Sequence, residues 1–178
     1  TVFYHLTRKN FSNKLGIDLE QGDALIIGGD LVYPDGSDKN YADRFKGPIR
    51  FVFPSNQEVH QPYLLAVPGN HDWYDGLTSF YRMMAQKDTI GNFKTTQNRS
   101  YFAYHLGFNH HILGLDNQLK GDLDLPQVDY FSRYVEKICR PGSHVYFIIL
   151  VAEPYWYSFE NEDFKKRRQR MDSLDYFV

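Results

Sequence analysis

The chain has 178 residues, of which 42% are hydrophobic and 17% aromatic, and its formal net charge is −2. This composition can build a hydrophobic core, so it excludes a disordered tail or linker. The near balance of charge gives no global field that would favour nucleic acid or anionic lipid as a partner. The single cysteine, Cys139, excludes an internal disulfide framework and a Cys-rich zinc site.

The size of the chain predicts one domain over residues 1–178. Because the sequence begins at Thr1 rather than Met, we expect this domain to be a piece of a longer protein. The longest apolar run, residues 145–152, is far shorter than the ~20 residues that span a bilayer, so we expect no membrane segment. Low cysteine use without a signal peptide favours the cytoplasm, and the oligomeric state is left open.

Short apolar runs alternate with amphipathic stretches, which favours an α/β fold. We expect strands at residues 24–27, 63–67 and 145–152, and a hairpin made of residues 100–106 and 110–116. Two apolar stripes at helical spacing predict helices. The stripes are Leu77, Phe80, Tyr81 and Met84, and Val128, Phe131, Val135 and Ile138. The stretch 34–62 is rich in proline and polar residues and shows no clear period, so we expect a long, partly ordered loop.

Two of the expected strands end in polar motifs. The first is followed by Gly-Gly-Asp30 and the second by Pro-Gly-Asn70-His71-Asp72. Open α/β sheets bind ligands at the carboxyl ends of their strands, so Asp30, Asn70 and His71 are expected to converge. Asp30 supplies an anionic oxygen, Asn70 a carbonyl oxygen, and His71 a proton for a leaving group. We expect Asp72 to hold the His71 imidazole in one tautomer.

The strings GGDLVYP (residues 28–34) and PGNHDWYDGL (residues 68–77) resemble the calcineurin-like metallophosphoesterase superfamily, in particular a subgroup of large, poorly characterised members. The GD pair and the GNHD block are the matching motifs, and each ends a predicted strand. The next element along the chain, the hairpin with Leu115-Asp116, is also similar to the family. The resemblance covers roughly residues 20 to 155.

This resemblance implies a four-layered α/β/β/α sandwich with a dimetal site at the strand ends. It implies that Asp30 bridges two divalent cations (Mn, Fe or Zn), and that Asn70 binds one cation and the substrate phosphate. His71 would protonate the leaving oxygen. Tyr33, three residues after Asp30, matches the metal-binding tyrosine of the purple acid phosphatase branch. The implied reaction is hydrolysis of a phosphate mono- or diester by water activated between the two metals.

The sequence departs from the family pattern in three places. No Asp-x-His or Asp-x-Gly precedes Asp30, and no Gly-His-x-His block comes after Pro154. Ala152, followed by Glu153, stands where the family usually has a histidine ligand, so either Glu153 replaces that ligand or the ligand is lost. We therefore expect the first and last core strands to lie outside this chain, which leaves the site incomplete and its metal binding weak or absent.

An alternative interpretation is a non-catalytic protein-interaction module on the same fold, which the missing ligands favour. Trp73 and Tyr74 are open to substrate contact or to packing, and the aromatic group 155–157 could line the same cleft. His110 and His111 are adjacent and point to opposite faces of a strand, so we expect one to be buried, one exposed, and neither to be a ligand. The basic run 165–170 is interpreted as part of a solvated helix.

Overall fold

The computed structural model describes residues 11–12, 18–19, 22–55, 61–85, 89–117 and 122–153. A first sheet has the order β3-β4-β6-β5, formed by β3 (Ala24–Ile27), β4 (Tyr63–Ala66), β6 (Phe93–Thr95) and β5 (Thr89–Ile90). Strand β3 pairs in parallel with β4, and β4 with β6, whereas β5 runs antiparallel to β6. A short antiparallel pair, β1 (Phe11–Ser12) and β2 (Asp18–Leu19), precedes this sheet.

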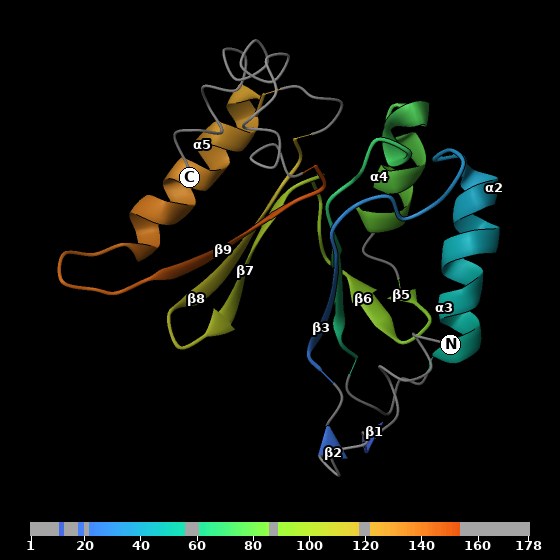
Figure 1. Ribbon diagram of the computed structural model, residues 1–178, viewed down its shortest axis with the longest axis horizontal. Coiled ribbons are helices and arrows are strands. Elements are labelled where there is room, and N and C mark those ends of the chain that lie inside the picture. Colours follow the sequence, from blue (N-terminus) through green and yellow to red (C-terminus); the bar gives the residue numbers. More distant parts are fainter. Residues whose placement is uncertain are drawn as a thin grey trace, which may run out of the picture.

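A second sheet has the order β7-β8-β9 and is formed by β7 (Phe102–Gly107), β8 (His110–Leu115) and β9 (Tyr146–Val151). The predicted hairpin is confirmed as β7 and β8, which are joined by Phe108 and Asn109. Both of these residues have positive φ, 48° and 64°, which gives the turn the twist that antiparallel strands require. After helix α5 (Leu125–Ile138), β9 returns parallel to β8 (Figure 1).

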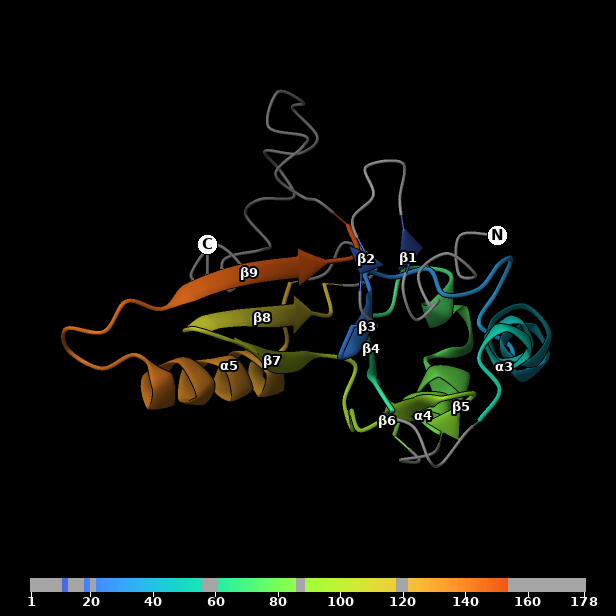
Figure 2. The same cartoon turned by 90° about the horizontal axis from the view of Figure 1, so that it is seen from below.

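The alternation of side chains along the strands explains how the layers pack. On β4, Leu64 and Ala66 face one buried cluster and Leu65 faces another. The second cluster lies between the sheets, because it also contains Phe102 of β7 and, partly buried, Leu150 of β9. Helix α5 packs on the opposite face of the second sheet, where Phe131 is fully buried (Figure 2). The structure is therefore a mixed α/β fold with two sheets facing each other and helices on their outer faces.

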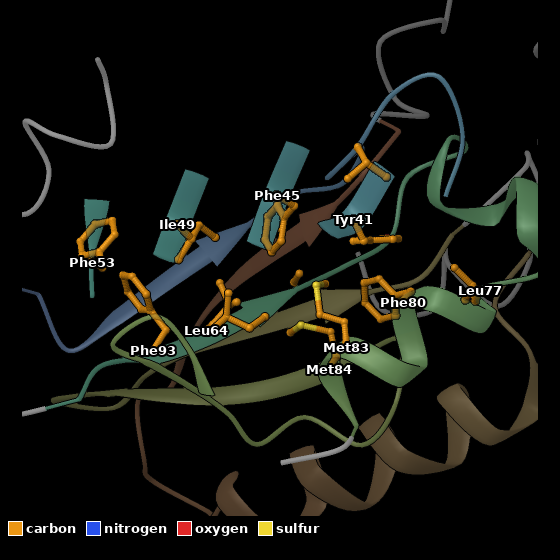
Figure 3. Close-up of a cluster of buried hydrophobic side chains, with 13 residues drawn as sticks. Tyr41, Phe45, Ile49, Phe53, Leu64, Leu77, Phe80, Met83, Met84 and Phe93 are labelled. Carbon is orange, nitrogen blue, oxygen red and sulfur yellow. The ribbon is translucent and has the colours of Figure 1, made fainter. Parts of the chain in front are cut away.

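The stretch 34–62 is not a loop over its middle part, which corrects the sequence interpretation. Residues 38–52 form one continuous helical segment made of α2 (Asp38–Asn40), the π-helical η1 (Tyr41–Lys46) and α3 (Gly47–Val52). Tyr41, Phe45, Ile49 and Phe53 recur every four residues and are all buried against the first sheet (Figure 3). A proline inside a helix lacks an N–H donor, and the wider π-helical turn directly before Pro48 accommodates this loss.

Both predicted helices are confirmed, with one correction to their buried faces. Helix α4 (Thr78–Met84) buries Phe80, Met83 and Met84, together with Leu77 just before it. Tyr81 is 39% exposed, so it does not belong to the buried stripe. Helix α5 begins after Asp124, whose carboxylate accepts a hydrogen bond from the backbone N–H of Gln127. No helix within the described ranges is long and apolar enough to cross a bilayer.

Strand β9 is confirmed, but the expectation that its whole run is buried is wrong. Tyr146 and Ile148 are 56% and 50% exposed, whereas Leu150, further along the same face, packs between the sheets. The face of β9 that looks toward the first sheet is thus more buried at its carboxyl end, which is the end next to the polar motifs. The expectations for the aromatic group 155–157 and the basic run 165–170 lie outside the described residues.

Candidate metal centre

The two sequence motifs meet because β3 and β4 are parallel neighbours whose carboxyl ends lie at the same edge of the first sheet. The approach is so close that it requires glycine at position 69. A Cβ atom on Gly69 would lie 2.1 Å from Asp30 Oδ1 and 2.5 Å from the Asp30 backbone nitrogen. Asp30 itself has a φ of 51°, a left-handed conformation that costs energy outside glycine and is found at functional sites. This close approach supports the prediction that Asp30, Asn70 and His71 lie together.

Both carboxylate oxygens of Asp30 already have hydrogen-bond donors. Oδ1 accepts from the backbone N–H of His71 at 3.2 Å, and Oδ2 accepts from the Tyr33 hydroxyl at 2.6 Å. The hydrogen bond to Asp30 raises the pKa of the Tyr33 phenol above its ordinary value, and slight burial and the negative charges nearby act in the same direction. Tyr33 is half exposed. The phenol oxygen and the carboxylate therefore lie next to each other at the surface.

The ring of His71 is oriented by a backbone carbonyl. Its Nδ1 lies 2.6 Å from the carbonyl oxygen of Pro34. Because a carbonyl can only accept, Nδ1 carries the proton, and Nε2 is the nitrogen available for proton transfer. The ring also lies against two tyrosines, with centroid distances of 4.1 Å to Tyr33 and 5.0 Å to Tyr74.

Asp72 does not hold the His71 ring, so the role expected for it from the sequence is wrong. Its side chain is fully buried and turns the other way. Oδ1 accepts from the Tyr41 hydroxyl at 2.5 Å, and Oδ2 accepts from the backbone N–H groups of Gly69 at 2.8 Å and Leu31 at 3.1 Å. Burial raises the pKa of Asp72, while these three hydrogen bonds favour the carboxylate form. Asp72 therefore joins both motif loops to the helical segment.

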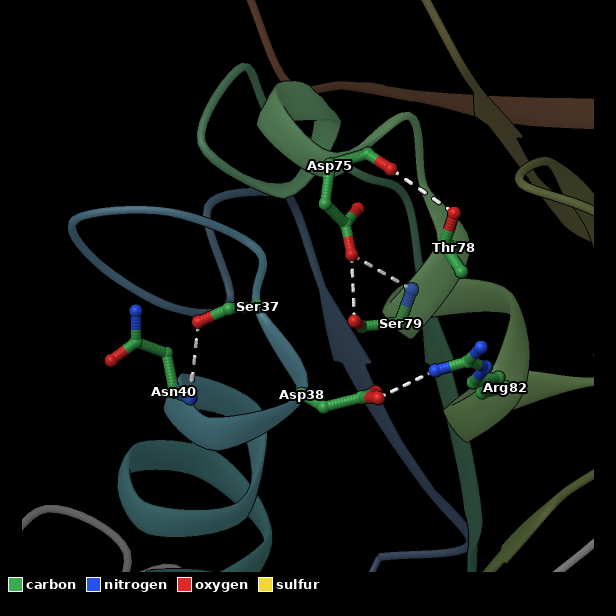
Figure 4. Close-up of polar contacts among 7 residues, drawn as sticks. All are labelled: Ser37, Asp38, Asn40, Asp75, Thr78, Ser79 and Arg82. Atoms are coloured by element: carbon green, nitrogen blue, oxygen red, sulfur yellow. Dashed lines mark hydrogen bonds and ion pairs between the residues drawn. The ribbon is translucent and has the colours of Figure 1, made fainter.

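A second set of polar contacts holds the GNHD segment from its far side (Figure 4). Asp75 Oδ2 accepts from the backbone N–H of Ser79 at 3.0 Å and from its hydroxyl at 2.6 Å, which satisfies a donor at the start of α4. Arg82 of α4 forms an ion pair with Asp38 of α2. Both charged groups are exposed, so this pair adds orientation more than stability.

The residues after His71 divide between the two sheets. Asn70 Nδ2 donates to the hydroxyl of Tyr74 at 3.0 Å, and Tyr74 is 58% exposed. Trp73 turns inward instead, since its Nε1 donates to Asp116 Oδ1 at 3.1 Å. Tyr74 is therefore beside the candidate site, whereas Trp73 links the GNHD turn to the second sheet.

The second sheet brings β9 to the same edge. Ala152 lies directly against Gly29, where an added Cβ would be 2.7 Å from that of Ala152. Glu153 is exposed, and its carbonyl accepts a hydrogen bond of 2.8 Å from Asn117 Nδ2. Sequence reasoning did not name Asp116 and Asn117 as candidate site residues, although Asp116 ends a predicted strand and Asn117 directly follows it.

The side chains of Asp30, Tyr33 and Asn70 supply carboxylate, phenol and amide oxygens, which are donors that suit hard divalent cations. The missing side chain at Gly69 lets the Asp30 carboxylate lie directly against the backbone of the GNHD motif. Their chemistry thus fits a cation. Within the described ranges, no group of three His, Cys, Asp or Glu side chains lies close enough to hold a metal.

Parallel strand ends that carry GD and GNHD motifs, opposed by a second sheet, define a metallophosphoesterase-like architecture. A family model described as calcineurin-like phosphoesterase matches residues 3–177. The chain belongs to this family, and the resemblance stated from the two motifs is confirmed. Comparisons with curated proteins and with solved structures find no significant match.

His110 and His111 behave as their positions on one strand predict. His110 is exposed, whereas His111 is buried and contacts the Tyr134 hydroxyl of α5 through Nδ1 at 2.7 Å. The two rings therefore lie on opposite faces of the second sheet, away from the strand ends that carry the motifs.

Proposed function

We propose that the protein is a metal-dependent hydrolase of phosphate mono- or diesters whose reaction centre lies at the carboxyl ends of β3 and β4. The observation that carries the proposal is the meeting of the two motifs: the Asp30 carboxylate accepts a hydrogen bond from the backbone N–H of His71, and the His71 ring is oriented through Nδ1 by the Pro34 carbonyl. Family membership supports hydrolysis of phosphate esters as the reaction class.

In this proposal Asp30, Asn70 and Tyr33 would hold two divalent cations (Mn, Fe or Zn), and Glu153 would extend the ligand set from β9. The cations, when bound, supply positive charge that polarises phosphoryl oxygens and lowers the pKa of water. As an imidazolium, with a proton on each ring nitrogen, His71 would donate the Nε2 proton to the leaving oxygen and return to the neutral ring, which keeps its Nδ1–H on the Pro34 carbonyl. Asp72 holds the two loops at the distance that this arrangement needs.

We also propose that further strands complete the ligand set. In the described part of the chain, β3 has β4 as its one strand neighbour and β9 has β8, so each sheet has an edge at which another strand can pair. Both edges adjoin the candidate site. A histidine brought there would supply the nitrogen ligand that Ala152 does not.

The first experiment measures bound metal by elemental analysis and hydrolysis of a generic aryl phosphate in added Mn²⁺, for the wild type and two variants. Asp30→Asn is expected to lower metal content and rate together. His71→Ala is expected to keep the metal and to lose about 10²–10⁴-fold in rate, the usual contribution of general acid catalysis. His144→Ala, at an exposed position outside the site, is the control and should match the wild type.

Equal metal content and equal rate in Asp30→Asn, His71→Ala and the wild type would contradict the proposal. A wild type that binds no metal and turns over no substrate would favour the second candidate, a non-catalytic protein-interaction module on the same fold. The observation behind that candidate is the methyl side chain of Ala152 against Gly29, at the position where the family usually has a histidine.

A further inference from the structure

Tyr74 is placed to control the amide of Asn70. The two residues are four apart within the turn that precedes α4, so their side chains leave the backbone on the same side. This turn is fixed by backbone hydrogen bonds from Trp73 N–H to the Asn70 carbonyl at 3.2 Å and from Gly76 N–H to the Trp73 carbonyl at 2.9 Å. The indole of Trp73 is anchored in turn on Asp116. Tyr74 is thus held beside Asn70 by a rigid piece of backbone.

The direction of the hydrogen bond matters for what Asn70 can bind. An asparagine amide has a donor end and an acceptor end of nearly equal size, and an exposed amide can rotate to present either. Here Nδ2 donates to the Tyr74 hydroxyl at 3.0 Å, which leaves Oδ1 as the end available to another partner. A cation binds the oxygen and is repelled by the N–H hydrogens, so this orientation is the one that permits metal binding.

Binding at Oδ1 and donation from Nδ2 also strengthen each other. A cation at the amide oxygen withdraws electron density from the nitrogen, and Nδ2 then becomes a better donor to the Tyr74 hydroxyl. Partners of this kind, which hold a ligand without touching the metal, commonly account for 10–100-fold in metal affinity. The Tyr74 ring lies 5.0 Å from the ring of His71, so the same residue also borders the proposed proton donor.

We propose that Tyr74 is a positioning residue that holds the Asn70 amide with its oxygen toward the metal, an inference that rests on the proposed function. The neighbouring hydrogen bond, from the Tyr33 hydroxyl to Asp30, joins a phenol to the other motif. The two tyrosines therefore flank His71, and each contacts one of the proposed ligands.

The test is the affinity for Mn²⁺, measured by titration calorimetry on the wild type, Tyr74→Phe and the matched control Tyr81→Phe. Tyr74→Phe keeps the ring beside His71 and removes only the hydroxyl. We expect about tenfold weaker Mn²⁺ binding. Tyr81, on α4, is 39% exposed, and its substitution should leave the affinity unchanged. Both variants should unfold at the wild-type temperature, because both hydroxyls are near the surface.

The background Asn70→Asp separates positioning from a general structural role. A carboxylate has two equivalent oxygens, so it needs no partner to select its orientation. We expect Tyr74→Phe to cost no affinity in this background. An unchanged affinity for Tyr74→Phe alone, or the same loss in both backgrounds, would overturn the inference while the proposed function stands. A wild type that binds no Mn²⁺ would overturn the proposed function, and this inference with it.

Discussion

At the carboxyl ends of both β4 and β8, the side-chain amide of a glutamine forms the backbone hydrogen bonds that a neighbouring strand would otherwise make. Ala66 of β4 lies beyond the last pair that β4 makes with β6, and the side-chain amide of Gln97 bonds to its N–H at 3.0 Å and to its carbonyl at 2.7 Å. Asp116 lies one residue beyond β8, and the amide of Gln127 bonds to its N–H and carbonyl at 3.0 Å each. Both glutamines are buried. Because buried backbone groups need hydrogen-bond partners, each glutamine amide takes the place of a neighbouring strand.

The two strand ends differ in the exposure of the polar residues that come next along the chain. After β4, Asn70 is exposed and His71 is half-buried. After β8, Asp116 and Asn117 are 3% and 1% exposed, and their side chains bond to Trp73 and to the carbonyl of Glu153. A strand end in this fold can therefore either leave its polar groups exposed or bury them in hydrogen bonds to neighbouring segments. The difference depends on burial, which the residue types alone do not reveal.

The largest effect on stability is expected at Asp72, a buried polar group beside the first sheet that holds neighbouring segments together by hydrogen bonds. Asp72→Ala removes the acceptor of three hydrogen bonds in a fully buried position. We expect a loss of about 3–5 kcal/mol in the free energy of unfolding, or about 10 °C in unfolding temperature. Circular dichroism during heating measures it.

Tyr41→Phe removes one of those three partners and is the graded control, with an expected loss of about 1–2 kcal/mol. If Asp72→Ala unfolded within about 2 °C of the wild type, the hydrogen bonds of Asp72 would not stabilise the fold, and Asp72 would not be comparable with Asp116.

The next effect concerns the contact between the two motif loops. Gly69→Ala would bring a Cβ within 2.1 Å of Asp30 Oδ1, so the loops must separate. We expect a loss of about 2–3 kcal/mol by analogy with overpacked cores, and weaker Mn²⁺ binding because Asp30 is displaced. Gly22→Ala is the matched control, since its nearest neighbour would be the Ala24 carbonyl oxygen at 3.9 Å. Loss of stability in both variants alike would show that the close approach is not the cause.

The sequence predicted the sheet strands that carry the site, because their apolar runs are continuous and end in glycine-rich motifs. It did not predict the helical segment 38–52, because the prolines and polar residues of 34–62 obscured the four-residue spacing of Tyr41, Phe45 and Ile49. It assigned Asp72 to the His71 ring because the two are adjacent in sequence. The structure gives that place to the Pro34 carbonyl, 37 residues away, a contact that only the folded chain defines.

The glutamine pair tests whether the two strand ends really share one framework. Gln97→Ala and Gln127→Ala each leave a buried N–H and a buried carbonyl of the strand without a partner. We expect each to cost about 2 kcal/mol. Gln97 also donates to the Arg99 carbonyl at 2.6 Å, so its substitution should cost slightly more. If the free energies of unfolding of the two variants, measured by chemical denaturation, differed by more than about 2 kcal/mol, the two glutamines would not have equivalent roles.

The smallest effect is a dependence of stability on pH that belongs to the second sheet. His111 of β8 is buried and contacts the Tyr134 hydroxyl on α5, and its ring stacks on that of His105 at 4.6 Å. Burial lowers the pKa of His111 below 6.5, and the charges of His105 and His110 lower it further. The unfolded chain therefore takes up the proton first as the pH falls, so this histidine's contribution to stability is present above about pH 6.5 and is lost below it.

Between pH 7.5 and pH 5.5, we expect the unfolding temperature of His111→Gln to fall by less than that of the wild type. His144→Gln, at an exposed position, should behave like the wild type. Identical losses in all three proteins would mean that His111 takes up its proton at the same pH in the folded and in the unfolded chain, and the histidine would then contribute no pH dependence to the stability of the second sheet.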